Sequence, residues 1–262
     1  MVDPRAIPRR AVRGAALLAL TAACGGSLAA AMALAPEKNR YETRDRITHA
    51  WASGLLDLFG VTLERHGAEV GHRGVGARGR VVVANHRSVI DIAVLLSLFG
   101  GAVLSRADLA TWPVIGPGAR AAGTIFVERG DRASGEQAVR AMVERLEARD
   151  TISVFPEGTT FVDDEVRPFK AGAFAAAMRA EVPVVPVGLV YPGEGEGFGD
   201  ESFLAHMARL ADTKRTRVGV GIGAPLTPLE GESIDAFRER TRAEVAALVR
   251  EARARLDGQK PS

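Results

Sequence analysis

The chain has 262 residues, of which 47% are hydrophobic and 25% are charged. This composition is typical of a globular protein with a large core, organised as one domain or two. The net charge of only +2 argues against a uniformly basic, nucleic-acid-binding surface. With Cys24 as its single cysteine, the chain can form neither an internal disulfide framework nor a cysteine-based metal site.

The N-terminal region begins with arginines and continues as an uncharged stretch, residues 14–35. That length can span a bilayer, although its many Ala and Gly residues give it only a weak drive to insert. Three interpretations fit: an anchoring or interfacial helix, a cleaved secretory signal ending near residue 35, and a lipoprotein segment lipidated on Cys24. The arginines before the stretch favour an anionic membrane surface.

The following segment, residues 47–63, has apolar residues near helical spacing and predicts a second, amphipathic helix. We expect the two helices to grip the membrane together. The alternative is that the second helix only packs on the main domain. Residues 1–65 are therefore expected to form a membrane-associated helical segment, and residues 66–262 the main domain.

Short strands rich in β-branched residues alternate with helical patterns along the rest of the chain. This alternation predicts an α/β domain with a mixed, largely parallel central sheet flanked by helices. The expected strands are 81–84, 102–104, 124–127, 151–155, 184–189 and 217–222, and the expected helices are 90–99, 134–149, 171–179, 202–211 and 234–256. A formal G-x-G-x-x-G at 74–79 precedes a strand instead of following one, so it predicts a turn and no dinucleotide site.

Polar residues follow several of the expected strands. In sheets of this kind ligands bind beyond the carboxyl ends of the strands. The residues at those ends are Asn85, His86 and Asp91 after the first strand, Glu128 and Arg129 after the third, and 156–159 after the fourth. The sequence therefore predicts a site at this edge of the sheet, built from several strands.

His86 and Asp91 form the candidate catalytic pair. A general base needs a partner that fixes its tautomer, and a turn capped by Ser88 can fold Asp91 back onto one imidazole nitrogen. The other nitrogen can then accept a proton, as in a triad without a protein nucleophile. Because no G-x-S-x-G occurs, we expect the nucleophile to be a substrate hydroxyl. The alternative is a histidine that only caps or packs.

Four ordered blocks between residues 81 and 188 resemble the glycerolipid acyltransferase family, whose best-known members are 1-acylglycerol-3-phosphate acyltransferases. NHRSVID at 85–91 is similar to the family's NH-x4-D motif, residues 105–129 to its second block, FPEGTT at 155–160 to its third, and residues 182–187 to its fourth. PFKAGAF at 168–174 resembles its lysine-bearing segment. Residues 66–262 would thus be the catalytic domain.

The resemblance implies an O-acyltransferase that uses acyl-CoA or acyl carrier protein as co-substrate and needs no cofactor. His86 would deprotonate the acceptor hydroxyl and Asp91 would orient His86. The hydroxyl would then attack the thioester. Arg129 would bind an acceptor phosphate, and Lys170 would add a second cation.

The third block would contact the glycerol part of the acceptor. The resemblance assigns Glu157 and Gly158 to the glycerol backbone and Thr159 to substrate binding. Structural alternatives are a cap on the following turn for Glu157, an ion pair with Asp131 for Arg129, and a solvated helix start for Lys170.

Thr160 departs from the pattern, because members that act on glycerol-3-phosphate acceptors commonly have arginine there. The expected acceptor is 1-acyl-glycerol-3-phosphate, giving phosphatidic acid; the alternative is another lysolipid, such as a lyso-ornithine lipid. A non-catalytic membrane-binding relative and a thioesterase that uses water are further alternatives.

The expected partners are membrane lipids and the acyl donor, with no nucleic acid. Because both donors are cytoplasmic, the resemblance places the catalytic face on the cytoplasmic side of a bacterial membrane. This location argues against a secreted lipoprotein. No metal site is predicted, since the histidines are scattered and the acidic run at 163–165 is typical of a solvated turn.

Overall fold

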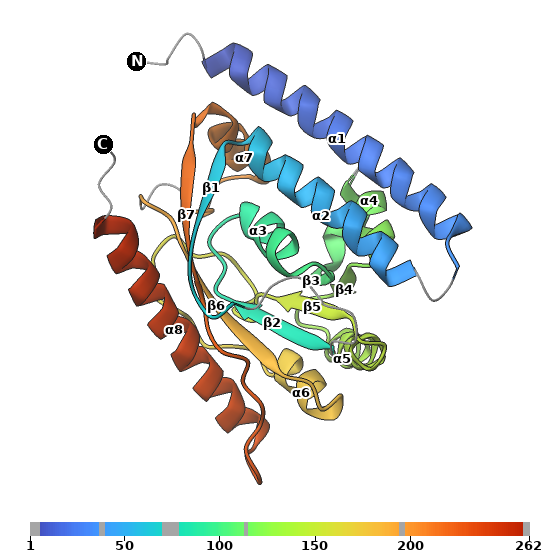
Figure 1. The fold of residues 1–262 in the computed structure, drawn as a ribbon, viewed down its shortest axis with the longest axis vertical. Helices are drawn as coiled ribbons and strands as arrows, with labels where there is room; N and C mark the ends of the chain where they lie inside the picture. Colours follow the sequence, from blue (N-terminus) through green and yellow to red (C-terminus); the bar gives the residue numbers. More distant parts are fainter. Residues whose placement is uncertain (1–5, 37–39, 70–78, 113–114, 194–196, 259–262) are drawn as a thin grey trace.

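The computed structural model describes the chain except for residues 1–5, 37–39, 70–78, 113–114, 194–196 and 259–262 (Figure 1). A seven-stranded sheet lies at its centre, in the order β1-β7-β6-β2-β5-β3-β4. The strands are β1 (Val61–Gly67), β2 (Arg80–Ala84), β3 (Ala102–Arg106), β4 (Ile125–Val127), β5 (Thr151–Val154), β6 (Val184–Val190) and β7 (Thr216–Ile222).

The sheet is mostly parallel, as predicted. Strands β6, β2, β5, β3 and β4 run in one direction. Strand β7 pairs with β6 in the antiparallel sense, and β1 runs parallel to β7. The carboxyl ends of the central strands therefore share one edge, where the sequence places its polar residues.

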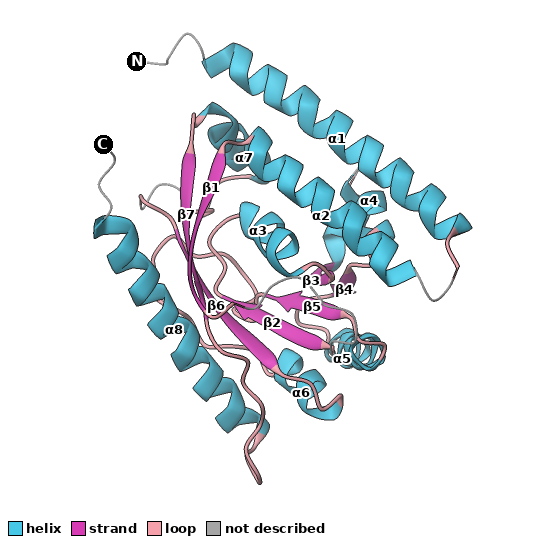
Figure 2. Ribbon diagram, viewed as in Figure 1, coloured by secondary structure: helices cyan, strands magenta, loops and turns pink. Residues whose placement is uncertain are grey.

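Helices cover both faces of the sheet (Figure 2). They are α1 (Ala6–Leu34), α2 (Arg40–Leu58), α3 (Ile90–Phe99), α4 (Ile115–Ala121), α5 (Arg132–Glu147), α6 (Gly172–Arg179), α7 (Phe203–Asp212) and α8 (Ile234–Gly258), with a 3-10 helix η2 (Ala107–Thr111). Alternation along β2 sets the layers: Val81 and Val83 pack with α5, α6 and α8, while Val82 and Ala84 pack with α2, α3 and α7.

Strand β1 corrects the predicted second helix, which was expected to continue to residue 63. The helix ends at Leu58, and Val61 begins an edge strand paired with β7. Gly60 separates the two at φ +66°, and an added Cβ there would lie 2.7 Å from the carbonyl oxygen of Lys214. The expected boundary between residues 65 and 66 falls inside this strand.

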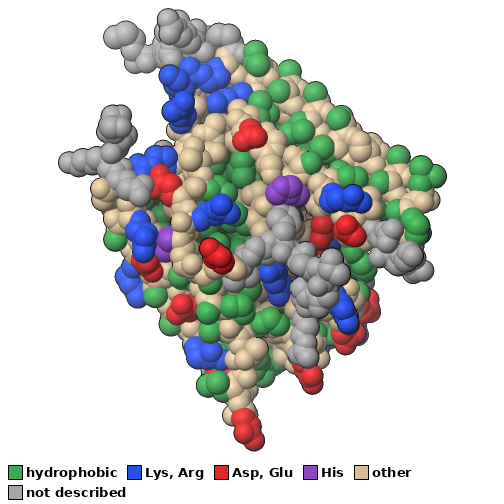
Figure 3. All heavy atoms as spheres, viewed as in Figure 1, with side chains coloured by type: hydrophobic (Ala, Val, Ile, Leu, Met, Phe, Trp, Pro, Cys, Tyr) green, Lys and Arg blue, Asp and Glu red, His purple; other side chains and the backbone are tan. Residues whose placement is uncertain are grey.

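Helix α1 lies beside α2 and is, among the described residues, the one helix long and apolar enough to cross a membrane. Only 6% of its apolar stretch is buried. Lys and Arg side chains gather near its N-terminal end, and hydrophobic side chains are spread along the rest of its visible length (Figure 3).

The arginines of α1 contact the protein itself. Arg9 donates to the carbonyl oxygen of Asp212 at 2.6 Å, Arg10 to the Asp212 carboxylate at 3.0 Å, and Arg13 to the carbonyl oxygen of Ala211 at 3.1 Å. Guanidinium groups at the carboxyl end of a helix satisfy its last carbonyls and its dipole. These three arginines therefore bind α1 to the end of α7; Arg5 lies outside the described residues.

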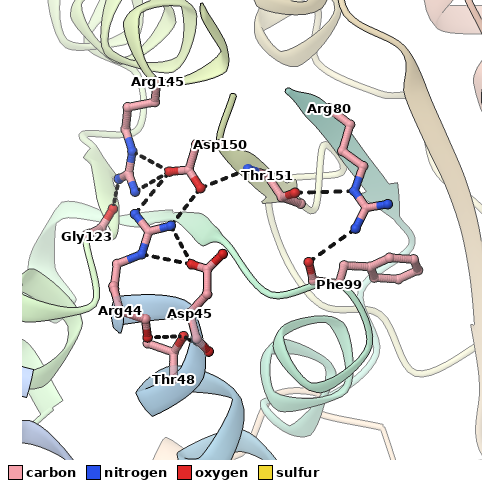
Figure 4. Close-up of polar contacts among 9 residues, drawn as sticks. All are labelled: Arg44, Asp45, Thr48, Arg80, Phe99, Gly123, Arg145, Asp150 and Thr151. Carbon is pink, nitrogen blue, oxygen red and sulfur yellow. Dashed lines mark hydrogen bonds and ion pairs between the residues drawn. The ribbon is translucent and has the colours of Figure 1, made fainter. Parts of the chain in front are cut away.

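A buried ion network joins α2 to the amino end of β5 (Figure 4). Arg44 donates to both oxygens of Asp150 at 2.6 and 3.0 Å, and Arg145 donates to Oδ2 at 2.6 and 2.9 Å. Burial alone would raise the pKa of Asp150, but Arg44 and Arg145 outweigh it and hold that pKa below its ordinary value. The network therefore fixes α2 at the sheet edge opposite the carboxyl ends.

Candidate active site

The candidate site begins where β2 ends. Asn85 Nδ2 donates to the carbonyl oxygen of Leu189 at 2.9 Å, and the Leu189 amide donates to Asn85 Oδ1 at 2.8 Å. This side chain thus continues the pairing of β2 with β6 for one more step, while the main chain leaves the sheet. The turn that follows presents His86 at the carboxyl edge.

The predicted contact of His86 with Asp91 is confirmed. His86 Nδ1 lies 2.9 Å from Asp91 Oδ2, in the first turn of α3. The backbone amides of Arg87 and Ser88 donate to the same oxygen at 2.6 and 2.8 Å. Asp91 is fully buried, so the turn between β2 and α3 wraps around its carboxylate.

This geometry fixes the tautomer of His86. An ionised carboxylate only accepts hydrogen bonds, so Nδ1 carries the proton and Nε2 has the free lone pair. The ring stacks on Phe155 with centroids 4.0 Å apart and planes inclined by 16°. His86 lines a cavity, and because Nδ1 is bound to Asp91, Nε2 is the nitrogen available to a ligand there.

The cavity has a volume of about 1740 Å³ and a mostly apolar lining. Such a volume exceeds the roughly 300–1,000 Å³ of ordinary small-molecule pockets. Its walls come from α1 and α2 on one side and from the carboxyl edge of the sheet with α4, α5, α6 and α7 on the other. The space suits a long apolar ligand with its reactive group near His86.

Five of the predicted site residues line this one cavity: His86, Arg129, Gly158, Thr159 and Lys170. Asp91 lies behind His86 and is buried. The structure therefore gathers residues from β2, β4 and the loop after β5 around a shared space, as the rule for carboxyl ends predicts.

Gly158 makes room for the amine of Lys170. Gly158 has φ +78°, and an added Cβ would lie 2.6 Å from Lys170 Nζ. The Lys170 amide donates to the carbonyl oxygen of Pro156 at 2.9 Å, which closes the loop after β5. Because the glycine lacks a side chain, the ammonium group lies directly against the loop formed by FPEGTT (residues 155–160), where this loop borders the cavity.

Arg129 adds a second cation to the cavity. The alternative pairing with Asp131 is not found in the described part of the chain, because Asp131 caps α5 by accepting from the amides of Ala133 and Ser134. Partial burial, followed by the positive charge of Arg106, lowers the pKa of Arg129 below its ordinary value, yet a guanidinium stays charged. Arg129 therefore brings a permanent positive charge to a part of the cavity that Glu128 and Asp131 also line.

Glu157 faces the protein backbone. Its Oε2 accepts from the amide of His86 at 2.7 Å and its Oε1 from the amide of Arg167 at 2.8 Å. The residue is 9% exposed and is absent from the described lining of the cavity. Burial raises its pKa, against the lowering effect of these two amides. Glu157 thus links the loop after β5 to the turn that follows β2, and its expected contact with glycerol stays a prediction.

Two contacts were not predicted. The Tyr191 hydroxyl donates to Asp91 Oδ1 at 2.6 Å. Ser88, expected to cap the turn, accepts from the Ile90 amide at 3.4 Å, and its Oγ also lies 2.9 Å from Nε2 of His206. The Ser88 hydroxyl thus contacts a turn amide as expected, while the Asp91 carboxylate accepts from the amides of Arg87 and Ser88. No sequence signal distinguishes Tyr191 from an ordinary core tyrosine.

The described residues contain no group of three or more His, Cys, Asp or Glu side chains that could hold a metal ion. The predicted site residues in the lining supply one imidazole, backed by a buried carboxylate, and two cations, and further arginines and acidic residues line the cavity beside them. The predicted site residues can take up a proton and bind an anionic group.

Comparison with known proteins gives a consistent result. The family described as Acyltransferase matches residues 63–190. The chain is 32% identical over 256 residues to a lyso-ornithine lipid O-acyltransferase of Pseudomonas aeruginosa, covering 93% of this chain and 92% of the relative. It is 27% identical over 214 residues to a 1-acyl-sn-glycerol-3-phosphate acyltransferase of Neisseria gonorrhoeae, covering 79% and 82%.

The fold also matches a solved structure. The crystal structure of the 1-acyl-sn-glycerophosphate acyltransferase PlsC from Thermotoga maritima superposes with a TM-score of 0.67 at 22% sequence identity. The match covers 97% of this chain and 100% of that chain, so it includes the N-terminal helices as well as the sheet.

Proposed function

This chain belongs to the acyltransferase family, and we propose that it moves a fatty acyl group from a thioester donor to the hydroxyl of a lysolipid. One observation carries the proposal. The imidazole of His86 is bound through Nδ1 to a buried carboxylate, 2.9 Å away, and borders an apolar cavity of lipid size. A proton acceptor beside such a cavity suits a lipid alcohol as nucleophile.

The proposed reaction balances with the groups present. His86 Nε2 takes the proton of the acceptor hydroxyl as its oxygen bonds to the thioester carbonyl carbon. The buried Asp91 carboxylate stabilises the imidazolium that forms. When the tetrahedral intermediate collapses, the carbon–sulfur bond breaks, and the imidazolium returns its proton to the leaving thiolate. The products are an ester and a free thiol.

The two cations support an acceptor with an anionic head group. Arg129 and Lys170 line the same cavity as His86, and a guanidinium binds phosphate through paired hydrogen bonds. On this basis 1-acyl-glycerol-3-phosphate is the first acceptor we propose, with phosphatidic acid as the product. Glu157, Gly158 and Thr159 belong to the loop that would surround its glycerol part.

A lyso-ornithine lipid is the second candidate acceptor. The relative that matches over 93% of this chain carries that name. Thr160, another residue of the cavity lining, stands where arginine is common in members that act on glycerol-3-phosphate acceptors. A site with one cation fewer suits a less strongly anionic head group.

Membrane association follows from α1 and from relatives that act on membrane lipids. We propose that the acyl donor is acyl-CoA or acyl carrier protein, and that no cofactor takes part. Since these donors are cytoplasmic, the catalytic face is proposed to lie on the cytoplasmic side of the cell membrane.

The test uses the full chain, purified and reconstituted in phospholipid vesicles. Free thiol is measured with acyl-CoA or acyl carrier protein as donor, and with 1-acyl-glycerol-3-phosphate, lyso-ornithine lipid or no acceptor. Mass spectrometry identifies the acylated lipid. The proposal expects thiol release that depends on one acceptor. Thiol release without any acceptor would indicate a thioesterase, and no release with any pair would contradict the proposal.

A further inference from the structure

Asp91 is held from two sides. Its Oδ2 faces the catalytic turn, where it accepts from two backbone amides and contacts His86. Its Oδ1 points away from the turn and accepts from the Tyr191 hydroxyl at 2.6 Å. Both Asp91 and Tyr191 are fully buried. The tyrosine therefore makes the contact that keeps the second carboxylate oxygen from being an unpaired buried acceptor.

The position of Tyr191 is set by the sheet and not by the catalytic turn. It directly follows β6, the parallel neighbour of β2. Two residues earlier, Leu189 exchanges two hydrogen bonds with the side chain of Asn85. This pairing fixes the register of the two strand ends, so the phenol ring has one place in the core and its hydroxyl meets Asp91 from behind.

We propose that Tyr191 is a positioning residue of the reaction, whose hydroxyl fixes the Asp91 carboxylate so that His86 presents an unprotonated Nε2 to the cavity. This inference rests on the proposed function of His86 as the base. Hydrogen bonds to a charged group are stronger than those between neutral groups. In a fully buried site, one such donor orients the carboxylate and disperses its charge.

The effect on His86 has a definite sign. The Tyr191 hydroxyl stabilises the Asp91 anion more when His86 is neutral than when it is an imidazolium that already balances the charge. Removing the hydroxyl therefore favours protonated His86 and raises its pKa. The acidic limb of the pH–rate profile, which reports the ionisation of the base, moves to higher pH.

Tyr191→Phe tests the proposal, because it keeps the ring in the core and removes only the hydroxyl. The matched control is Tyr41→Phe, the same change at the chain's other tyrosine. Tyr41 lies on α2 beside Arg44, whose guanidinium carbon is 5.2 Å from the ring centroid, at the sheet edge opposite the site. We expect Tyr191→Phe to lower kcat about tenfold with little change in acceptor KM. Tyr41→Phe should leave both unchanged.

A substrate-free measurement separates this inference from the proposed function. NMR titration of the His86 imidazole, assigned by its loss in His86→Ala, should give a higher pKa in Tyr191→Phe than in the wild type. An unchanged or lowered His86 pKa would overturn the proposal, whatever the activity. If the wild-type protein showed no acyl transfer, the proposed function would be contradicted. The titration would still test the role of Tyr191, because it needs no substrate.

A double mutant distinguishes positioning from packing. In an Asp91→Ala background the contact of the Tyr191 hydroxyl with the carboxylate is gone, so Tyr191→Phe should lower kcat no further through Asp91. An equal fall in both backgrounds would show that Tyr191 only supports the fold and would overturn the proposal. A KM effect larger than the kcat effect would do the same, because it would place the hydroxyl on the substrate.

Discussion

Two buried aspartates at opposite edges of the sheet are held in different ways. Asp150, at the amino edge, binds the guanidinium groups of Arg44 and Arg145. Asp91, at the carboxyl edge, binds backbone amides, a tyrosine hydroxyl and the His86 imidazole. No lysine or arginine in the described part of the chain forms an ion pair with Asp91. One charge is thus neutralised within the fold, whereas the other remains available to stabilise an imidazolium.

The difference shows how one sheet separates stability from chemistry. A buried ion pair that loses a partner leaves an uncompensated charge, so the amino edge is sensitive to mutation. At the carboxyl edge the carboxylate accepts from backbone amides and a tyrosine hydroxyl, and His86 beside it faces the cavity. Changes at the first edge should alter folding, and changes at the second should alter turnover.

The largest expected effect is at the carboxyl edge. His86→Ala removes the proton acceptor and should lower kcat by about 10²–10⁴-fold, the usual contribution of a general base. Thermal unfolding should stay close to wild type, because the His86 side chain is partly exposed to the cavity. Full activity with an acyl-CoA and the preferred lysolipid would contradict the assignment of His86 as the base.

At the amino edge, a mutation should reduce the stability of the fold more than it reduces turnover. Arg44→Ala removes one of the guanidinium groups that bind Asp150 and should reduce the free energy of unfolding by roughly 3 kcal/mol, the scale of a broken buried pair. The turnover of the folded protein should change little. Urea denaturation measures the loss, and Arg255→Ala, at an exposed pair with Glu251 on α8, serves as the control with little expected change. Equal stabilities of the two variants would mean that the network contributes nothing.

The sequence predicts the part of the site that one turn determines. The spacing of His86 and Asp91 within a strand–turn–helix unit is local, and the structure has the expected contact. Tyr191 could not be found this way, because it is 100 positions from Asp91 and only the pairing of β2 with β6 brings them together. Glu157 was assigned to a ligand by resemblance, whereas its two backbone contacts depend on tertiary packing.

The layered α/β fold was predictable because hydrophobic alternation and helix periodicity repeat along the chain. Strand β1 was not, because its alternation is short and follows the apolar spacing of α2 without a break in hydrophobicity. What separates them is Gly60, whose positive φ ends the helix. The arginines of α1 were interpreted as membrane contacts, whereas three of them bind α7, which no local pattern reveals.

A smaller effect should come from the cations of the cavity. Arg129→Ala removes a cavity cation whose acidic neighbour, Asp108, only partly offsets its charge, so it should raise KM for 1-acyl-glycerol-3-phosphate by about tenfold and change kcat less. Lyso-ornithine lipid should be affected less, because its head group carries no phosphate. Steady-state kinetics with both acceptors checks this. An equal KM change for both would contradict phosphate binding by Arg129.

The smallest expected effect is a change in how stability depends on pH. Arg44 and Arg145 hold the pKa of Asp150 below its ordinary value despite burial, so the folded state binds this proton less readily than the unfolded state. A lowered folded-state pKa gives stability that is present above the unfolded value, about 3.9, and is lost as the pH falls through the folded value. In Asp150→Asn this contribution is absent at every pH. The difference in unfolding free energy between wild type and Asp150→Asn should therefore be largest near pH 7 and shrink below about pH 4.

Urea titrations from pH 7 to pH 3 measure this difference, with Asp235→Asn at an exposed pair as the control that shows no such trend. A difference that stayed constant over this range would place the contribution of Asp150 in packing and not in its charge.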